Sequence, residues 1–369
     1  MPNAMNRRQF LYCTATLGAS FALSEIPFPL AEAFGRQNVD RSLLKGLRIV
    51  DAHAHPEQFH TDNPRIKDLS STLESITELG MTASVFSAVG DLSEISSRNP
   101  QEDDYGSTHT QLNRVLRMSK VGKVRLILKS ADLPDVVGPG NPPGAILAIE
   151  GGNALGGKPE RIDEFHKIGV RLITLMHYSQ NELGDVMLVW GEKRPASARN
   201  GLTAKGRKVV ERMQELGMVV DVAHAHSLTL KHVVEIGNKP LVDSHTSPCP
   251  LPDPPGCTRP RKWEDMEHIA KTGGVVCTWP LAYEAGGTTR RSFSDWAREI
   301  LDMKKKLGIE HVGLGTDGGG NLPSMINGYR DVRDLVSLVA AMREVGLSQS
   351  DIQSYMGENF LRVLKACIG

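Results

Sequence analysis

The residues of this chain that could do chemistry are mainly histidines and acids, and the clearest pair is His53-Ala54-His55. On an extended segment, residues two positions apart point to the same face, so both imidazoles could reach one metal ion. Pro56 biases His55 towards that extended conformation. Other imidazoles and carboxylates follow apolar runs further along the chain, at Glu150, His177, His224, His245 and Asp317. Imidazole and carboxylate ligands suit zinc or a similar divalent ion.

Such distant groups need a scaffold that gathers them, and the chain repeats a helix-then-strand pattern that could do so. In residues 203–222, apolar residues recur at helical spacing up to Leu216, Gly217 ends the helix, and a short β-rich run follows. We predict strands at residues 47–51, 82–87, 145–149, 171–175, 218–221, 241–243, 274–277 and 311–315. Eight such units in 369 residues favour an α/β fold of the (β/α)₈ TIM-barrel type.

An open doubly wound sheet is the alternative fold, and periodicity alone does not exclude it. Its dinucleotide-binding version loses support because no G-x-G-x-x-G follows the first strand. Residues 88–141 are longer than one connection needs, and we expect an inserted helix around residues 111–118 and an extra strand at 124–128.

A barrel would bring the candidate ligands together, because the C-terminal ends of its strands converge on one mouth. A single histidine after a strand is more often an ordinary hydrogen-bonding residue than a ligand. The convergence of all six positions at one mouth is much harder to explain in that way.

Composition argues against several other functions. Lys plus Arg equals Asp plus Glu, at 43 each, so no basic face for nucleic acid is indicated. No G-x-S-x-G elbow supports a serine hydrolase, and no C-x-x-C pair supports a cysteine zinc site. Cys249 and Cys257 flank a Pro-rich loop and could form a disulfide in an oxidising compartment, while free buried thiols are the alternative.

The first 33 residues have the features of a bacterial export signal. Paired arginines at Arg7-Arg8 precede a short apolar stretch and the small-residue site Ala31-Glu32-Ala33. This segment resembles the twin-arginine type, which implies contact with the export machinery and a periplasmic or exported protein. An uncleaved anchor is the alternative. Residues 34–369 are then expected to form a single barrel domain.

An ordered set of short motifs resembles one family, the membrane (renal-type) dipeptidases of the amidohydrolase superfamily. The motifs are Val50-Asp51-Ala52-His53, Ala148-Ile149-Glu150-Gly151-Gly152, residues 169–177, residues 217–224, Asp243-Ser244-His245-Thr246-Ser247, Gly313-Leu314-Gly315-Thr316-Asp317 and residues 357–364. They run in the family's order from about Val50 to the end of the chain. Singly they are short, but the ordered set is highly specific.

The resemblance implies a barrel that holds two zinc ions and hydrolyses dipeptides. Glu150 would bridge the ions, with His53 and His55 on one and His224 and His245 on the other. Asp317 would act as general acid and base, and His177 would stabilise the tetrahedral intermediate and contact the substrate. Arg261 would bind the substrate's C-terminal carboxylate, with Arg259 as the alternative.

Three departures from the family pattern bear on these roles. The family usually has His-x-Asp after its first strand, where this chain has His55, so the net charge of the site changes and the metal preference stays open. The family usually has Asp-Phe-Asp-Gly after its last strand, whereas this chain has Asp317-Gly318-Gly319-Gly320, so one carboxylate is missing. The Pro-rich loop 248–257 is unlike the usual connection and borders the mouth of the barrel.

Two other functions remain open on the sequence alone. The same chemistry could act on N-acyl amino acids, lactones or phosphoesters, because loops set the substrates of a barrel. An exported relative could instead be a maturation factor that does not turn over free dipeptides. The sequence leaves open which dipeptide and stereochemistry are preferred, which metal is native, whether the signal is cleaved, and whether the chain forms a homodimer.

Overall fold

The structure is a computed structural model that describes residues 40–61, 67–95, 103–138, 140–188, 199–237, 239–249, 259–285 and 288–369. The predicted export signal and most of the Pro-rich loop, including Cys257, lie outside these residues.

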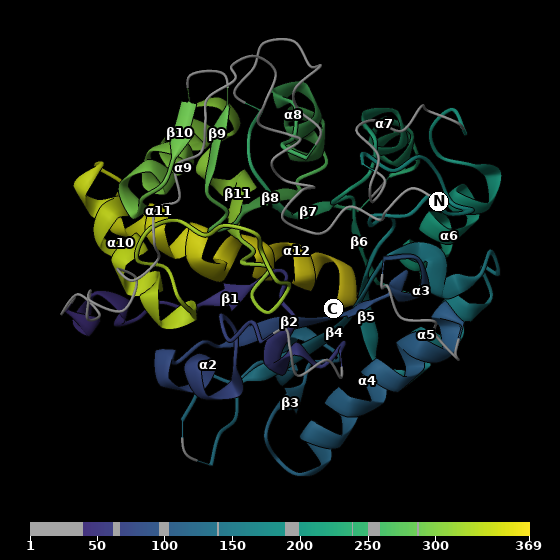
Figure 1. The fold of residues 1–369 in the computed structure, drawn as a ribbon, viewed down its shortest axis with the longest axis horizontal. Coiled ribbons are helices and arrows are strands. Elements are labelled where there is room, and N and C mark those ends of the chain that lie inside the picture. Colours follow the sequence, from purple (N-terminus) through teal and green to yellow (C-terminus); the bar gives the residue numbers. More distant parts are fainter. Residues whose placement is uncertain are drawn as a thin grey trace, which may run out of the picture.

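In the described part of the chain, eight parallel strands form one sheet in the order β1-β2-β4-β5-β6-β7-β8-β11. Three backbone hydrogen bonds join the first strand region to the last: Ala52 donates to Leu314 (3.0 Å), His55 to Gly318 (2.7 Å) and Asp317 to His53 (2.8 Å). The predicted (β/α)₈ barrel is therefore confirmed (Figure 1). The strands are β1 (Val50–Asp51), β2 (Ala83–Val89), β4 (Gly144–Glu150), β5 (Val170–Thr174), β6 (Val219–Asp221), β7 (Val242–Thr246), β8 (Val275–Thr278) and β11 (Val312–Leu314).

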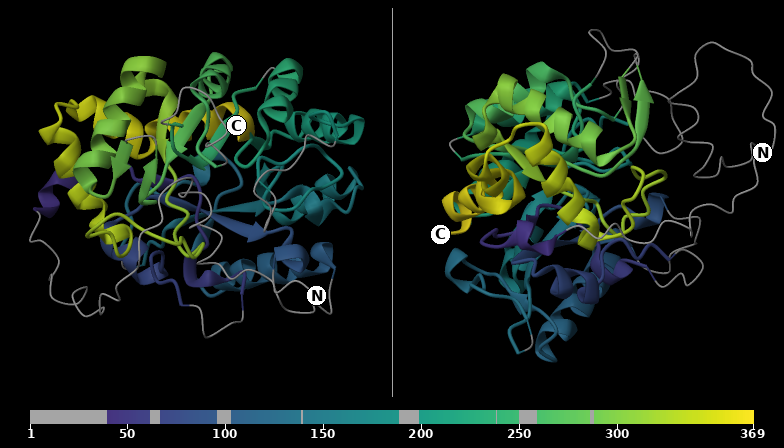
Figure 2. Two further views of the ribbon diagram at one scale, coloured as in Figure 1. Left: turned by 45° about the horizontal axis from the view of Figure 1, so that its top comes forward. Right: turned by 90° about the vertical axis from the view of Figure 1, so that its left-hand side faces the viewer.

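Helices surround this sheet, as Figures 1 and 2 show. Most of the helix-ending glycines have the left-handed backbone that stops a helix, with Gly80 at φ 77° and Gly217 at φ 74°. Gly237 differs, since its φ is −73°. The helices are α2 (Leu73–Leu79), α3 (Leu92–Ile95), α4 (Asp104–Lys120), α5 (Arg161–Ile168), α6 (Ala204–Glu215), α7 (Ser227–Ile236), α8 (Trp263–Lys271), α9 (Phe293–Leu307), α10 (Leu335–Glu344), α11 (Gln349–Gln353) and α12 (Asn359–Ile368).

The long segment after β2 contains the two elements expected there. The inserted helix is α4, longer than predicted, and the extra strand is β3 (Arg125–Leu126), which pairs in parallel with β4. The structure adds an antiparallel hairpin that the sequence did not predict, formed by β9 (Tyr283–Ala285) and β10 (Thr288–Arg290) between β8 and α9.

The interior of the barrel is closed at one end by the last helix. Early residues of the strands, such as Val50, Val219 and Val275, form one buried apolar cluster with Phe360 and Leu364 of α12. Burial of this apolar surface stabilises the fold and fixes α12 under the N-terminal ends of the strands. The opposite end, where the strands finish, is left for polar side chains.

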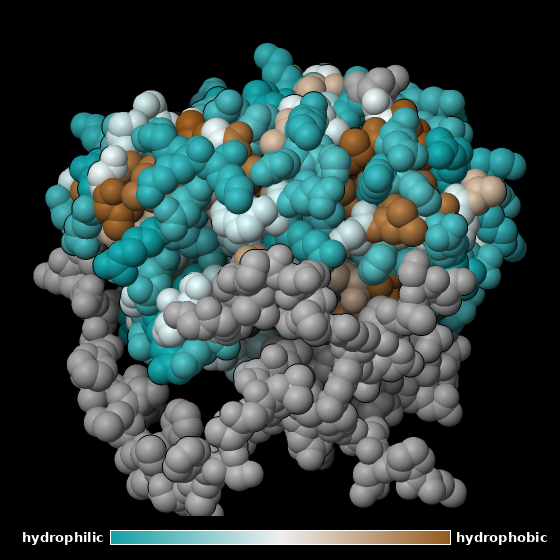
Figure 3. All heavy atoms as spheres, turned by 90° about the horizontal axis from the view of Figure 1, so that it is seen from above, coloured by the Kyte–Doolittle hydropathy of each residue, from teal (hydrophilic) through white to brown (hydrophobic). Residues whose placement is uncertain are grey.

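The outer surface has a mixed character. On the face drawn in Figure 3, apolar side chains are scattered among hydrophilic ones. Within the described residues, no helix is both long enough and apolar enough to cross a membrane.

Candidate metal centre

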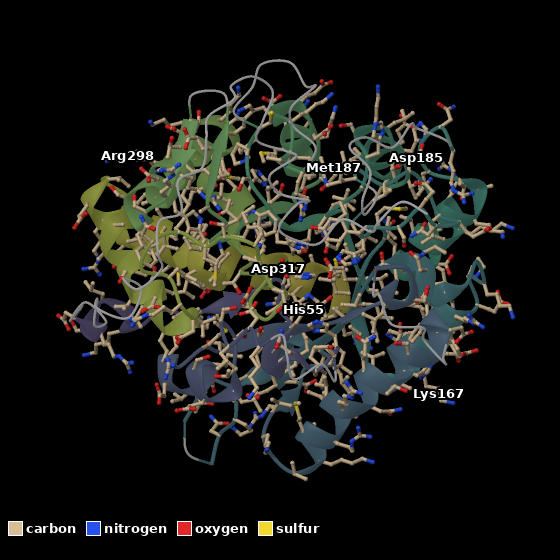
Figure 4. The ribbon with its side chains drawn as sticks, viewed as in Figure 1. His55, Lys167, Asp185, Met187, Arg298 and Asp317 are labelled. Atoms are coloured by element: carbon tan, nitrogen blue, oxygen red, sulfur yellow. The ribbon has the colours of Figure 1, made fainter. Side chains whose placement is uncertain are left out.

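The ends of six strands supply the candidate site. His53 and His55 follow β1, Glu150 ends β4, His177 follows β5, and His224 follows β6. His245 lies within β7, and Asp317 follows β11. Parallel strands arranged as a barrel put these ends at one mouth, so residues up to 264 positions apart in the sequence meet. Figure 4 shows His55 and Asp317 near the centre of the molecule, while Lys167 and Arg298 lie at its edge.

Glu150 is the centre of the cluster, and all five imidazoles present Nε2 to its carboxylate. Oε1 lies 3.4 Å from Nε2 of His53, 3.2 Å from that of His224 and 3.4 Å from that of His245. Oε2 lies 3.4 Å from Nε2 of His55 and 3.6 Å from that of His177. Burial opposes ionisation of Glu150, but the surrounding histidines outweigh it and hold the pKa of Glu150 well below its usual value.

Asp317 lies at the edge of this cluster and is its most exposed acid. Its Oδ1 is 3.5 Å from Nε2 of His55 and 4.0 Å from Nε2 of His53, with 13% of the side chain exposed. The backbone of Asp317 is left-handed, at φ 51°, and its amide donates to the carbonyl of His53 (2.8 Å). A Cβ on Gly320 would lie 2.0 Å from Oδ1 of Asp317, so the glycine run leaves room for the carboxylate.

The Nδ1 sides of three rings are held by oxygen atoms. Nδ1 of His55 is 2.7 Å from the carbonyl of Ser87. The Ser244 hydroxyl donates to Asp221 (2.6 Å), so its oxygen can accept from Nδ1 of His245 (3.0 Å) and of His53 (3.3 Å). Each ring can therefore hold a proton on Nδ1 while its Nε2 faces the cluster, and this is the arrangement in which a histidine binds a metal ion through Nε2.

Two observations support a cation in this cluster. Nε2 of His53 is buried without a hydrogen-bond partner. Nε2 of His224 and Nε2 of His245 lie 3.0 Å apart, although burial and nearby positive groups lower the pKa of both rings well below the usual value. Two imidazole nitrogens this close repel each other through their lone pairs unless a proton or a cation lies between them. This geometry therefore fits a metal site. Three overlapping groups can hold an ion: His53–His55–Asp317, His53–Glu150–His245 and Glu150–His177–His224.

The geometry argues against the predicted role of Arg261. Its side chain is fully buried, and its guanidinium donates to Asp243 Oδ2 (2.7 Å), to the carbonyl of Ala225 (2.6 Å) and to the carbonyl of Val222 (2.8 Å). Because all three guanidinium nitrogens already donate to the protein and the side chain is fully buried, Arg261 presents no accessible edge to a substrate carboxylate.

Arg259, the alternative, lies beside the cluster and has unused hydrogen-bond donors. Its Nη2 donates to the carbonyl of His245 (2.7 Å) and lies 3.3 Å from Nε2 of His224. Its guanidinium carbon is 4.6 Å from the centre of the Trp279 ring. Its Nε and Nη1 are buried without hydrogen-bond partners. Unpaired buried donors beside the candidate metal ligands favour an anionic group at this position.

The sequence did not point to Asp91, which the structure places against the site. Asp91 follows β2, and its Oδ1 lies 2.7 Å from Nδ1 of His177. Asp221 was also not predicted to contribute, although it positions Ser244 behind two of the rings. The only sequence signal was that both acids stand at or just after a strand end.

The described cysteines differ in their bonding state. Cys249 is disulfide-bonded, whereas Cys277 and Cys367 are free thiols. The partner of Cys249 is thus outside the described residues, as is the predicted partner Cys257.

Comparison with known proteins points to one family. The sequence profile described as "Membrane dipeptidase (Peptidase family M19)" matches residues 39–367. Dipeptidase tcpJ of Claviceps purpurea is 27% identical over 227 residues, covering 60% of this chain and 50% of the relative. Dipeptidase aclJ of Aspergillus oryzae is 29% identical over 225 residues, with 60% and 50% covered. The matches thus span about half the length of these curated relatives.

Solved structures share the fold. The probable dipeptidase PvdM of Pseudomonas aeruginosa superimposes with a TM-score of 0.75 at 17% identity, covering 89% of this chain and 97% of that one. A metallopeptidase of Rhodobacter sphaeroides, solved with a phosphinate mimic of the dipeptide L-Ala-D-Ala, gives 0.73 at 18% identity, covering 87% and 99%.

Proposed function

Because the chain belongs to the membrane dipeptidase family, peptidase family M19, we propose that it is a zinc-dependent dipeptidase for short peptides with a free C-terminal carboxylate. The observation that carries this proposal is the cluster of five imidazole Nε2 atoms, all within 3.6 Å of the Glu150 carboxylate. Nitrogen-rich sites with a carboxylate suit zinc.

The residues at the mouth fit two neighbouring ions that share Glu150. One ion would be held by His53 and His55, with Asp317 within reach, and the other by His224 and His245. When bound, the ions would supply a water of lowered pKa and polarise the scissile carbonyl. The chain's contribution is to hold the imidazole Nε2 atoms and one shared carboxylate together in a buried pocket.

Two residues would act directly on the substrate. Asp317, exposed at the edge of the cluster, accepts the proton of the attacking water and returns it to the leaving amine. His177 donates from Nε2 to the oxygen that becomes negative in the transition state. Burial disfavours the charged ring of His177, but the Asp91 and Glu150 carboxylates outweigh it and raise the pKa of His177.

Arg259 would bind the C-terminal carboxylate of the substrate. Its Nε and Nη1 are buried without hydrogen-bond partners, and these free N–H groups can donate to the oxygens of a carboxylate. A carboxylate anchored close to the metal ligands leaves room for only a short substrate beyond the scissile bond. This gives the physical reason to expect dipeptides rather than long chains.

The test is a panel of dipeptides with L- and D-residues at each position, run with metal quantification and with amidated dipeptides as controls. We expect about two zinc ions per chain and turnover that requires the free carboxylate. Turnover of lactones, N-acyl amino acids or phosphoesters without dipeptide turnover would overturn the proposal in favour of another hydrolase of the superfamily. Two bound metals with no turnover of any of these compounds would instead favour a maturation factor.

We also propose that residues 1–33 direct export by the twin-arginine route. The support is the pair Arg7-Arg8 ahead of a short apolar stretch. Replacing both arginines by lysine should retain the protein in the cytoplasm of a bacterial host, as judged by cell fractionation. Unchanged periplasmic yield would contradict this route.

A further inference from the structure

One buried carboxylate holds the loop that carries His177. Asp91 is fully buried, and its Oδ1 accepts from Nδ1 of His177 at 2.7 Å. Its Oδ2 accepts from the amide of Tyr178 (3.1 Å), the amide of Ser179 (3.0 Å) and the hydroxyl of Ser179 (2.9 Å). A single side chain therefore fixes three consecutive residues after β5.

The backbone reaches this position through a close approach of two strand ends. The Gly90 amide donates to the carbonyl of Glu150 (2.7 Å), and a Cβ on Gly90 would lie 2.1 Å from the carbonyl oxygen of Gly151. A Cβ on Gly151 would in turn lie 3.6 Å from Cγ of Asp91. A larger residue at position 90 would push β2 away from β4, so the glycine lets Asp91 stand directly beside the end of the strand that carries Glu150.

The hydrogen bond fixes which nitrogen of His177 faces the site. An ionised carboxylate only accepts hydrogen bonds, so the proton between Asp91 and His177 belongs to Nδ1. Nε2 is then the nitrogen that points into the cluster, 3.6 Å from Oε2 of Glu150. The ring stands edge-on to that of His224, with 4.9 Å between centres.

We propose that Asp91 is a positioning residue that holds a proton on Nδ1 of His177 and aims its Nε2 at the reacting carbonyl. The catalytic part of this inference rests on the proposed dipeptidase function. Asp91 belongs to none of the groups of described residues that could hold a metal ion, and each of its oxygens already has a partner on the His177 loop. Its effect must therefore pass through that loop.

Replacing Asp91 by asparagine tests the proton assignment with almost no change in volume. The amide oxygen of the asparagine can keep the Tyr178 and Ser179 amides as donors. Its NH2 group then faces Nδ1 of His177, which must accept, so Nδ1 no longer carries a proton. Asp104→Asn is the matched control, because Asp104 is a half-buried acid nearby that accepts from the amide of Ser93 (2.9 Å).

The first measurement is the imidazole ¹⁵N spectrum of the full metal-free protein, with the His177 signals identified by their loss in His177→Gln. We expect a proton on Nδ1 of His177 in the parent protein and in Asp104→Asn, and its absence from Nδ1 in Asp91→Asn. A parent spectrum without a proton on Nδ1, or an Asp91→Asn spectrum that retains one, would overturn the proposal. This outcome does not depend on whether the protein hydrolyses dipeptides.

The second measurement is kinetic. Asp91→Asn should lower kcat roughly 10- to 100-fold with unchanged zinc content, as for other residues that orient a site group from behind. KM should change by no more than about twofold, since substrate binding is spared. In a His177→Gln background the same substitution should cause no further loss. A second loss of equal size in that background would show that Asp91 does not act through His177, whereas an inactive parent protein would count against the proposed function alone.

Discussion

Arg259 and Arg261 stand two positions apart, yet the structure gives them opposite environments. Arg261 donates hydrogen bonds to Asp243 and to two backbone carbonyls. Arg259 has two nitrogens, Nε and Nη1, without hydrogen-bond partners beside the candidate metal ligands. The family resemblance favoured Arg261, because the sequence alone does not show its contact with Asp243, which the fold brings in from β7. In contrast, the ligand types and their places at strand ends were readable from local sequence.

The two arginines should respond differently to alanine. Arg259→Ala should raise KM for free dipeptides roughly 10- to 100-fold, the loss expected for hydrogen bonds to a charged group, and leave amidated analogues unaffected. Arg261→Ala should instead cost about 3–5 kcal/mol of unfolding free energy, because Asp243 stays buried without its partner. Steady-state kinetics and denaturant unfolding of both variants check this. An equal effect of Arg259→Ala on amidated substrates would contradict the carboxylate contact.

Asp317 offers the sharpest test of the chemistry. Asp317→Asn should retain the metal content and lower kcat by on the order of 10²–10⁴, the range for a positioned acid and base. Asp302→Asn, an exposed acid on α9 paired only with Lys305, serves as control. Turnover at the parental rate in Asp317→Asn would rule out the role.

At the scale of elements, the barrel strands were predictable and the accessory pieces were not. Each barrel strand is a short apolar run that sits between a helix and a polar end, so all eight could be placed within a few residues. The sequence predicted that this strand ends at Ser87, whereas β2 runs to Val89. Because of this difference, Asp91 was not identified as a residue that follows a strand end. The β9–β10 hairpin has few apolar residues, and its stability comes from long-range contacts such as that of Arg290 with Glu299.

The closing helix α12 should matter for stability rather than for chemistry. Phe360 is buried in the cluster under the strands, with 1% of its surface exposed. Phe360→Ala should lower the free energy of unfolding by about 3–5 kcal/mol, through lost burial and the cavity left behind. Lys365→Ala on the exposed side of the same helix should be close to neutral. Equal unfolding midpoints for the two variants would contradict this packing role.

At the scale of the whole molecule, the proposed metal ligands come from strands all around the barrel, so metal removal should loosen the fold. Chelation should lower the melting temperature, with a loss of about 4 kcal/mol where free zinc stood about 1,000-fold above its dissociation constant. Calorimetry with and without chelator measures this, and Glu150→Gln, which removes the bridging ligand, should show little response. An unchanged melting temperature after verified metal loss would argue against a metal site that stabilises the fold.

Metal binding should also depend on pH. Burial opposes protonation of His55, but contacts with Asp317 and Glu150 outweigh it and raise the pKa of His55 to about 10 in the metal-free protein. Below that pH an ion must displace a proton from Nε2, so affinity should rise as pH rises. Titrations at about pH 6 and about pH 8 should show tighter binding at the higher pH, beyond the change in a His55→Asn variant. Affinity that falls with pH would contradict this.

The position of α12 has a consequence for how the chain is made. Every barrel strand precedes α12 in the sequence, yet the interior cluster includes Phe360, Val363 and Leu364 of that helix. While a ribosome is still synthesising the chain, the end of the barrel that α12 will close stays open, and its apolar lining faces water. Completion of the core must therefore wait until synthesis has passed α12, and until then the exposed apolar lining favours aggregation.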